Sequence, residues 1–203
     1  MTVVNALAAA NVVVFLLWLW AAVPMQVMAD HFLVSWSHLE RGRVWVLITA
    51  LFSHNLLFHL FVNMIVLLSF GPPLERIMGS GAFLRFYLGA GIVGSLAHAA
   101  TSNFLMDDPA RAALGASSAL AGVLLLFSLT FPKARVLLFF IVPLPALIAA
   151  LAFVAIDIWG LVAQIEGQGL PIGHGAHLGG ALAGLLYFLV RGNELKRRGV
   201  III

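Results

Sequence analysis

A serine and a histidine far apart in this sequence could form a nucleophile and its base. Ser117 lies in the small-residue stretch Gly115–Ala119, and His177 lies in a glycine-rich stretch, residues 173–184. A serine hydroxyl is a weak nucleophile until a neighbouring base accepts its proton, and histidine is the commonest such base. We therefore treat Ser117 and His177 as candidate catalytic residues for acyl transfer.

Other polar side chains accompany this pair. Asn55, His59 and Asn63 are spaced i, i+4 and i+8, so they share one face of a helix. His59, Ser117 and His177 would stand at similar depth on three different helices if the chain crosses a membrane. Ionisable groups inside a membrane are costly and by default indicate function, although cross-helix packing is the alternative.

The composition indicates a membrane protein. The 203 residues are 63% hydrophobic and 9% charged, with a mean hydropathy of +1.08, whereas soluble domains carry about 25% charged residues. The net charge of +3 does not predict nucleic-acid binding, because the basic residues lie between apolar runs. The absence of cysteine excludes disulfides and thiol catalysis.

Apolar runs predict an all-α protein of six membrane-spanning helices in one domain, residues 1–203, surrounded by the lipid bilayer. The first charged residue is Asp30, so we expect a retained membrane helix at the start, not a signal peptide. The expected spans are 5–28, 55–70, 82–102, 115–131, 144–162 and 174–190.

Charge asymmetry predicts the orientation of these spans. With the N-terminus in the cytoplasm, most of the 11 Lys and Arg residues fall in cytoplasmic loops or the tail, as the positive-inside rule requires. We therefore expect both termini in the cytoplasm and the Ser117 level near the opposite face. The expected setting is a prokaryotic inner (plasma) membrane, crossed several times.

The residues resemble the rhomboid family of intramembrane serine proteases. The resemblance covers about residues 43–190 and rests on four motifs in the family's order, which are His54-x4-His59-x3-Asn63, Gly71-x3-Glu75-x3-Gly79, Gly115-x-Ser117-x and Ala176-His177-x2-Gly180-x3-Gly184. It implies a six-helix bundle that hydrolyses peptide bonds in single-span or other membrane-protein substrates. No metal, soluble cofactor or nucleic acid is implied.

The resemblance also implies a role for each matching residue. Ser117 would be the nucleophile, and His177 would be the general base and then the general acid. His59 and Asn63, with the Ser117 N–H, would bind the oxyanion. Glu75 would tie a cytoplasmic turn.

Two further positions, Asp157 and Ala121, bear on what could support His177. The family uses a Ser–His dyad without a carboxylate, so we expect Asp157 to be a polar anchor near the outer end of the fifth span. Many members carry an aromatic residue four positions after the serine, where this chain has Ala121. We therefore expect His177 to lack that aromatic partner.

Other functions were weighed against this one. An aspartyl intramembrane protease needs two membrane carboxylates, where only Asp157 is available, and the zinc motif H-E-x-x-H is absent. His174 and His177, with His59, could instead ligate a metal in a transporter or metal-binding protein. A non-catalytic rhomboid-like protein that binds membrane clients is the remaining alternative.

Overall fold

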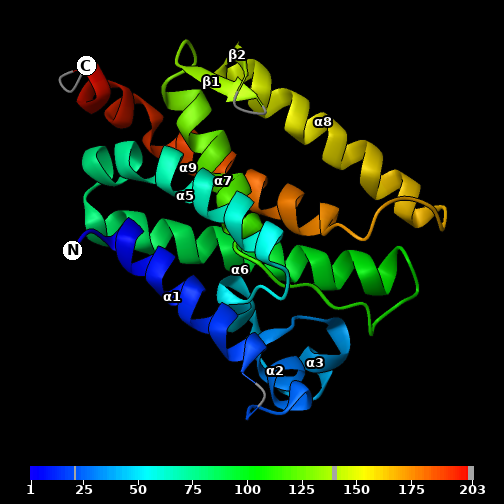
Figure 1. The fold of residues 1–203 in the computed structure, drawn as a ribbon. Coiled ribbons are helices and arrows are strands. Elements are labelled where there is room, and N and C mark those ends of the chain that lie inside the picture. The colour runs from blue at the N-terminus through cyan, green and yellow to red at the C-terminus, as the bar shows by residue number, and fades with distance from the viewer. Residues whose placement is uncertain (21, 139–140, 201–203) are drawn as a thin grey trace.

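The fold is known from a computed structural model, which describes residues 1–20, 22–138 and 141–200. Helices dominate, with one short antiparallel hairpin (Figure 1). In chain order the elements are α1 (Val3–Leu19), α2 (Met25–Phe32), α3 (Trp36–Glu40), α4 (Val46–Thr49), η1 (Ala50–Phe52), α5 (Leu57–Met78), α6 (Ser80–Phe104), α7 (Ser117–Thr130), β1 (Arg135–Leu138), β2 (Val142–Pro145), α8 (Ala146–Ile165) and α9 (His174–Val200).

Three helices of the described chain, α5, α6 and α8, are long and apolar enough to cross a membrane. α1 and α7 are apolar but shorter. α9 starts as a glycine-rich apolar helix and ends in a charged turn with Arg197 and Arg198. The start of α1 and the end of α9 lie at the same end of the bundle (Figure 1).

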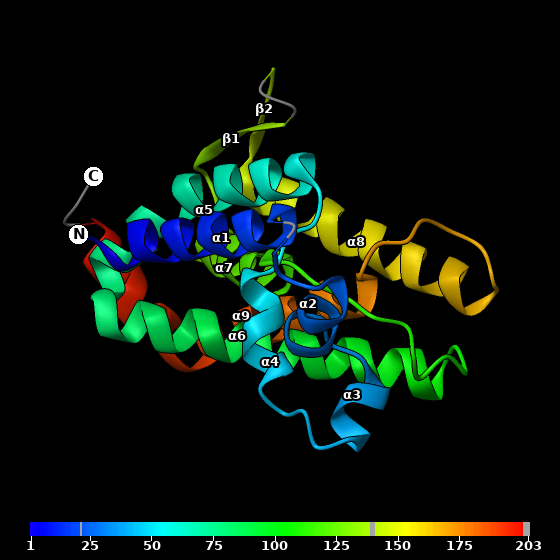
Figure 2. The same ribbon diagram turned by 60° about the horizontal axis from the view of Figure 1, so that its bottom comes forward.

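The first expected span, residues 5–28, is two helices in the structure. α1 ends at Leu19, and α2 begins at Met25 after Pro24. Proline lacks an N–H and disfavours helical backbone in the residue before it, so a helix cannot run smoothly into this position. The short helices α2, α3 and α4 gather beside the lower part of the bundle (Figure 2).

The second span is longer than expected. α5 runs on through Pro72 and Pro73 to Met78, and the chain turns at Gly79, whose φ is +84°. A Cβ at Gly71 would lie 2.7 Å from Val4 Cγ2, so glycine there permits close packing of α1 on α5. Prolines are tolerated inside membrane helices where neighbouring groups satisfy the freed backbone.

Glu75 ties three elements together at this end of the bundle. Its carboxylate accepts hydrogen bonds from the backbone N–H groups of Val3 and Val4, at 2.8 and 3.0 Å, and from Ser80 Oγ at 2.6 Å. The first N–H groups of a helix have no acceptor within the helix. A carboxylate there completes α1 and joins it to the α5–α6 turn.

A β-hairpin, absent from the sequence expectation, connects α7 to α8. β1 and β2 pair antiparallel, with Arg135 opposite Pro145 and Leu138 opposite Val142. α8 begins directly after Pro145. Proline is favourable just before or at the first position of a helix, where no donor is needed.

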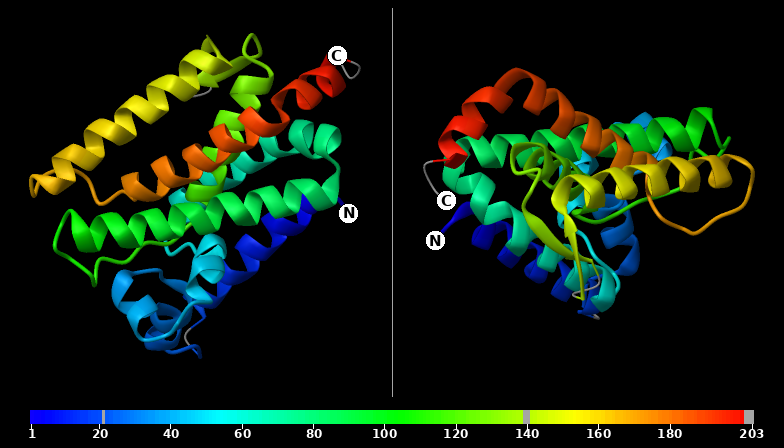
Figure 3. Two further views of the ribbon diagram at one scale, coloured as in Figure 1. Left: turned by 180° about the vertical axis from the view of Figure 1, so that it is seen from behind. Right: turned by 90° about the horizontal axis from the view of Figure 1, so that it is seen from above.

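α7 is the central helix of the bundle, and α8 lies at its outer edge (Figure 3). Most side chains of α7 are buried, whereas few on α8 are. α7 and α9 touch through backbone at glycines, since a Cβ at Gly180 would clash with the Ser118 carbonyl oxygen and one at Gly122 would lie 2.7 Å from the Gly180 carbonyl oxygen. This contact fixes the N-terminal turn of α7 against that of α9.

Candidate active site

Ser117 is the first residue of α7, and the loop before it is held in place by backbone contacts. Gly115 has a φ of +118° and donates its N–H to the Ala50 carbonyl at 2.8 Å. Upstream, Val34 and Ala113 exchange both backbone hydrogen bonds. A helix N-terminus offers unpaired N–H groups and the positive end of the helix dipole. Ser117 therefore stands where negative charge is stabilised.

The imidazole of His177 lies beside the Ser117 hydroxyl. His177 is in the first turn of α9, is 8% exposed, and its Nε2 lies 2.9 Å from Ser117 Oγ. This is hydrogen-bond distance for proton transfer between a nucleophile and its base. The backbone contact of α7 with α9 at Gly180 brings the two residues together across 60 positions of sequence.

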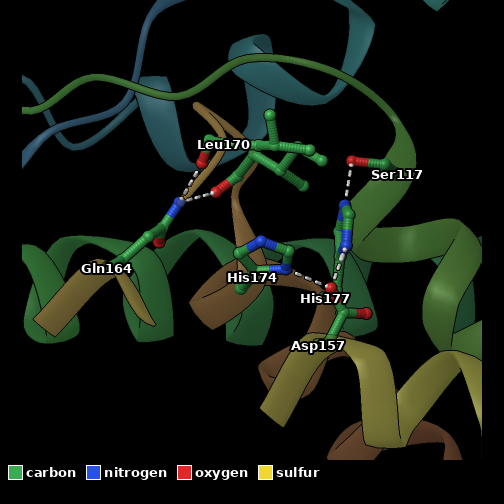
Figure 4. Close-up of polar contacts among 7 residues, drawn as sticks. Ser117, Asp157, Gln164, Leu170, His174 and His177 are labelled. Carbon is green, nitrogen blue, oxygen red and sulfur yellow. Dashed lines mark hydrogen bonds and ion pairs between the residues drawn. The ribbon is translucent and has the colours of Figure 1, made fainter. Parts of the chain in front are cut away.

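Asp157 of α8, which the sequence analysis expects to be a polar anchor, lies on the other side of the His177 ring. Its Oδ1 is 3.0 Å from His177 Nδ1 and 2.7 Å from His174 Nδ1, and the carboxyl group is buried. Figure 4 shows the His177 imidazole between Ser117 and Asp157. The structure thus places a carboxylate in contact with both histidines of α9.

His177 also has an aromatic neighbour, which comes from α8 and not from position 121 of α7. The ring of Phe153 lies 5.4 Å from the His177 ring, with the planes inclined at 31°. Phe153 packs in the same apolar cluster as Ala121, on α7. A small side chain at position 121 leaves room for an aromatic ring that arrives from α8 instead.

Sequence reasoning did not predict that Phe153 and Asp157 would contact His177. Phe153 and Asp157 share a face of α8 by their i, i+4 spacing. A lone carboxylate in an apolar span was a visible signal. No pattern in the sequence indicated which residues of α9 this face would meet.

The polar residues before and within α5 lie near the Ser117 loop. A Cβ at Gly115 would lie 2.6 Å from His59 Cε1 and 3.7 Å from His54 Nε2, and the His54 and His59 rings meet edge to face at 4.8 Å. Asn63 is 4% exposed and its amide donates to the His59 carbonyl at 2.8 Å. His59 is thus beside the loop that leads to Ser117, with Asn63 one turn behind it.

Hydrogen bonds also anchor the loop that leads from α8 into α9. Gln164 Nε2 donates to the carbonyls of Leu170 and Ile172, at 2.6 and 2.7 Å (Figure 4). Two residues later, α9 begins at His174. The start of α9 is therefore supported from α8 by Gln164 as well as by Asp157.

One cluster could hold a metal ion. Ligating atoms of Asp157, His174 and His177 lie within 4.8 Å of one another. The same atoms form the hydrogen bonds described above, so a bound cation would replace those bonds. His59, which the sequence suggested as a third ligand, does not belong to this cluster.

Comparison with known proteins identifies the class of this chain. The family model for the rhomboid domain matches residues 41–194. The chain is 35% identical to RHOMBOID-like protein 12, mitochondrial, of Arabidopsis thaliana, over 88% of this chain and 55% of that protein. It is 37% identical to Rhomboid protein 1, mitochondrial, of Saccharomyces cerevisiae, over 91% of this chain and 51% of that protein.

A human protein is similarly related. The chain is 32% identical to Presenilin-associated rhomboid-like protein, mitochondrial, of Homo sapiens, over 95% of this chain and 48% of that protein. The chain thus spans about half the length of the curated relatives it matches.

This chain belongs to the rhomboid family, whose members are generally intramembrane serine proteases. It is a multi-pass membrane protein. The names of these relatives place them in mitochondria, which conflicts with the sequence-based expectation of a prokaryotic plasma membrane. The expectation of an integral membrane protein stands without that detail.

Proposed function

We propose that this chain is a serine endopeptidase of six membrane spans, both termini on the cytoplasmic side. It would cleave membrane-protein substrates in or beside a transmembrane segment, through a Ser117–His177 pair and an acyl-enzyme. The single observation that carries the proposal is the 2.9 Å separation of Ser117 Oγ and His177 Nε2. The start of α1 and the end of α9 lie at the same end of the bundle, which supports the topology (Figure 1).

The first half-reaction forms the acyl-enzyme. Ser117 Oγ attacks the scissile carbonyl carbon while its proton passes to His177 Nε2. The carbonyl oxygen becomes an oxyanion, which the Ser117 N–H, His59 and Asn63 would stabilise. Collapse of this intermediate breaks the C–N bond, and His177 returns the proton to the leaving amine.

The second half-reaction uses water in place of serine. His177 accepts a proton from a water molecule, whose oxygen attacks the acyl carbon. The second tetrahedral intermediate collapses by breaking the bond to Ser117 Oγ, which regains its proton from His177. A helical substrate must unwind locally first, because its carbonyls are otherwise hydrogen-bonded within the helix.

The test is cleavage of a single-span substrate in liposomes. The wild-type protein cleaves it, while Ser117→Ala and His177→Ala do not. Ser118→Ala is a matched control, because Ser118 is the adjacent buried serine of the same helix, and it retains cleavage. A serine-directed fluorophosphonate labels the wild type and Ser118→Ala.

Three results would contradict the proposal. Labelling that survives Ser117→Ala means that another residue is the nucleophile. Binding of the substrate by the wild type without cleavage favours the non-catalytic alternative. Loss of cleavage on chelation, with one bound metal per chain, favours the metal-binding alternative.

A further inference from the structure

Asp157 is a buried carboxyl group in an apolar helix, where an isolated charge is costly. It is 2% exposed, and Oδ2 has no hydrogen-bond partner among the described residues. All of its hydrogen bonds there go through Oδ1, to the Nδ1 atoms of His174 and His177. The carboxyl group is therefore directed entirely at the two histidines of α9.

The His177 ring lies between a carboxyl group and a hydroxyl group, each within hydrogen-bond distance of one ring nitrogen. Asp157 Oδ1 is 3.0 Å from Nδ1 on one side, and Ser117 Oγ is 2.9 Å from Nε2 on the other. A carboxylate in its ionised form only accepts hydrogen bonds, and with Asp157 in that form Nδ1 carries the ring proton. The Nε2 lone pair is then free to accept the Ser117 proton, as a general base requires.

We propose that Asp157 is a positioning residue for His177, so that Ser117, His177 and Asp157 act as a triad. The inference rests on the proposed function and deepens it. Asp157 acts through His177 and never touches the substrate. It selects the ring tautomer, fixes the ring orientation, and stabilises the imidazolium that forms when Ser117 attacks.

His174 holds the carboxylate in that position. Its Nδ1 donates to the same Oδ1 atom at 2.7 Å, a shorter bond than that of His177. The His174 ring occupies the space that a side chain would fill at Gly160, one turn along α8 from Asp157. The carboxylate therefore stays in place whether or not His177 is protonated.

Charge balance favours this role over that of a packing contact. When the Ser117 proton moves to Nε2, a cation forms on a buried ring and an oxyanion forms on the substrate. Opposite charges at about 3 Å attract far more strongly in a membrane-buried site than in water. No proton needs to move to Asp157 for this stabilisation.

The decisive variant is Asp157→Asn, which keeps the side-chain shape and removes the charge. The amide can present either its oxygen or its NH2 to Nδ1, and the NH2 orientation puts the ring proton on Nε2, where it blocks the base. We expect kcat to fall about 10²-fold, with KM unchanged. Asp157→Glu should recover part of the loss, because it restores a carboxylate.

A spectroscopic measurement tests the hydrogen bond without turnover. Protein labelled with 15N-histidine should show a strongly downfield Nδ1 proton for His177 that persists in Ser117→Ala and disappears in Asp157→Asn. Gln164→Ala is the matched control, since it removes hydrogen bonds from the same helix. It should lower thermal stability while kcat stays near the wild-type value.

Each outcome decides the inference separately from the proposed function. Wild-type kcat in Asp157→Asn, with Ser117→Ala inert, overturns the inference and leaves the protease function intact. An equal fall of kcat in Gln164→Ala overturns it as well. A metal ion that is lost in Asp157→Asn would show that the cluster is a metal site instead. If the wild type never cleaves, the downfield proton still shows whether Asp157 holds His177.

Discussion

The ring of Phe153 packs against the imidazole of His177, with their centroids 5.4 Å apart. The two residues come from α8 and α9, and the small Ala121, on the helix that carries Ser117, belongs to the same apolar cluster as Phe153. An aromatic residue on a neighbouring helix thus supports the histidine.

The first prediction exchanges the sizes of the side chains of Phe153 and Ala121. Phe153→Ala should lower kcat roughly 2- to 12-fold, since aromatic pairs contribute about 0.5–1.5 kcal/mol beyond their burial. Adding Ala121→Phe to that variant should restore part of the activity, whereas Ala121→Phe alone should lower stability through overpacking. Activity assays of the four proteins measure the coupling, and strictly additive effects would argue against a shared site.

The second prediction separates oxyanion binding from packing at Asn63. Asn63→Ala should lower kcat by about 10²-fold, the usual effect of losing one oxyanion donor. Asn11→Ala is the control, because Asn11 is also buried and donates to the Leu7 carbonyl at 2.8 Å with the same i, i−4 spacing. Equal losses of kcat in the two variants would assign Asn63 a packing role.

The third prediction concerns the contact that joins α7 to α9. Gly180→Ala should destabilise the fold by about 1–3 kcal/mol, because the new methyl group would clash with the Ser118 carbonyl oxygen. Gly89→Ala is the control, since a Cβ there meets nothing within 4 Å. Gly89→Ala should be neutral or slightly stabilising. Thermal unfolding in detergent measures both, and an unchanged Gly180→Ala would disprove the close contact.

The fourth prediction is a pH dependence in the segment between α2 and α4. The Arg43 guanidinium, hydrogen-bonded to Asp30, holds the pKa of that carboxyl below its ordinary 3.8. A depressed carboxyl pKa stabilises the fold above pH 3.8, and the effect is lost as the pH falls below that value. Arg43→Ala should therefore raise hydrogen exchange of residues 33–45 slightly at pH 7 and have no effect near pH 2.

Arg41→Ala is the control for this pair, because Arg41 is exposed and has no ion pair among the described residues. Exchange is compared at each pH after correction for its intrinsic rate. The effect should be small, as for ion pairs near a protein surface in general. An identical response of the two variants would mean that the Asp30–Arg43 pair does not stabilise this segment.

The sequence predicted the parts of the site that belong to local motifs. Ser117 follows a small-residue loop, and His177 precedes the Gly180–Gly184 face by one turn, so their convergence could be inferred from spacing. The helical class was also predictable from apolar runs. Proline at position 24 carried the signal for the break after α1, which we read as one continuous span.

The contributions of α8 could not be predicted in the same way. Whether Phe153 and Asp157 meet His177 depends on how far α8 slides along α9 and how it rotates. Those two quantities follow from packing at Ala121 and Gly160, positions whose importance is only their small size. A small residue gives no sign in the sequence of what will fill the space beside it.

Gly160 has no side chain, and the space that this leaves on α8 determines how α8 is aligned along α9. The His174 ring occupies that space, so the two helices have one favoured alignment. A shift of α8 by a single residue would put a side chain where the ring now lies and would withdraw the Phe153 ring and the Asp157 carboxylate together. The contacts that hold the His177 ring would then depend on the alignment of α8, a helix that carries neither Ser117 nor His177.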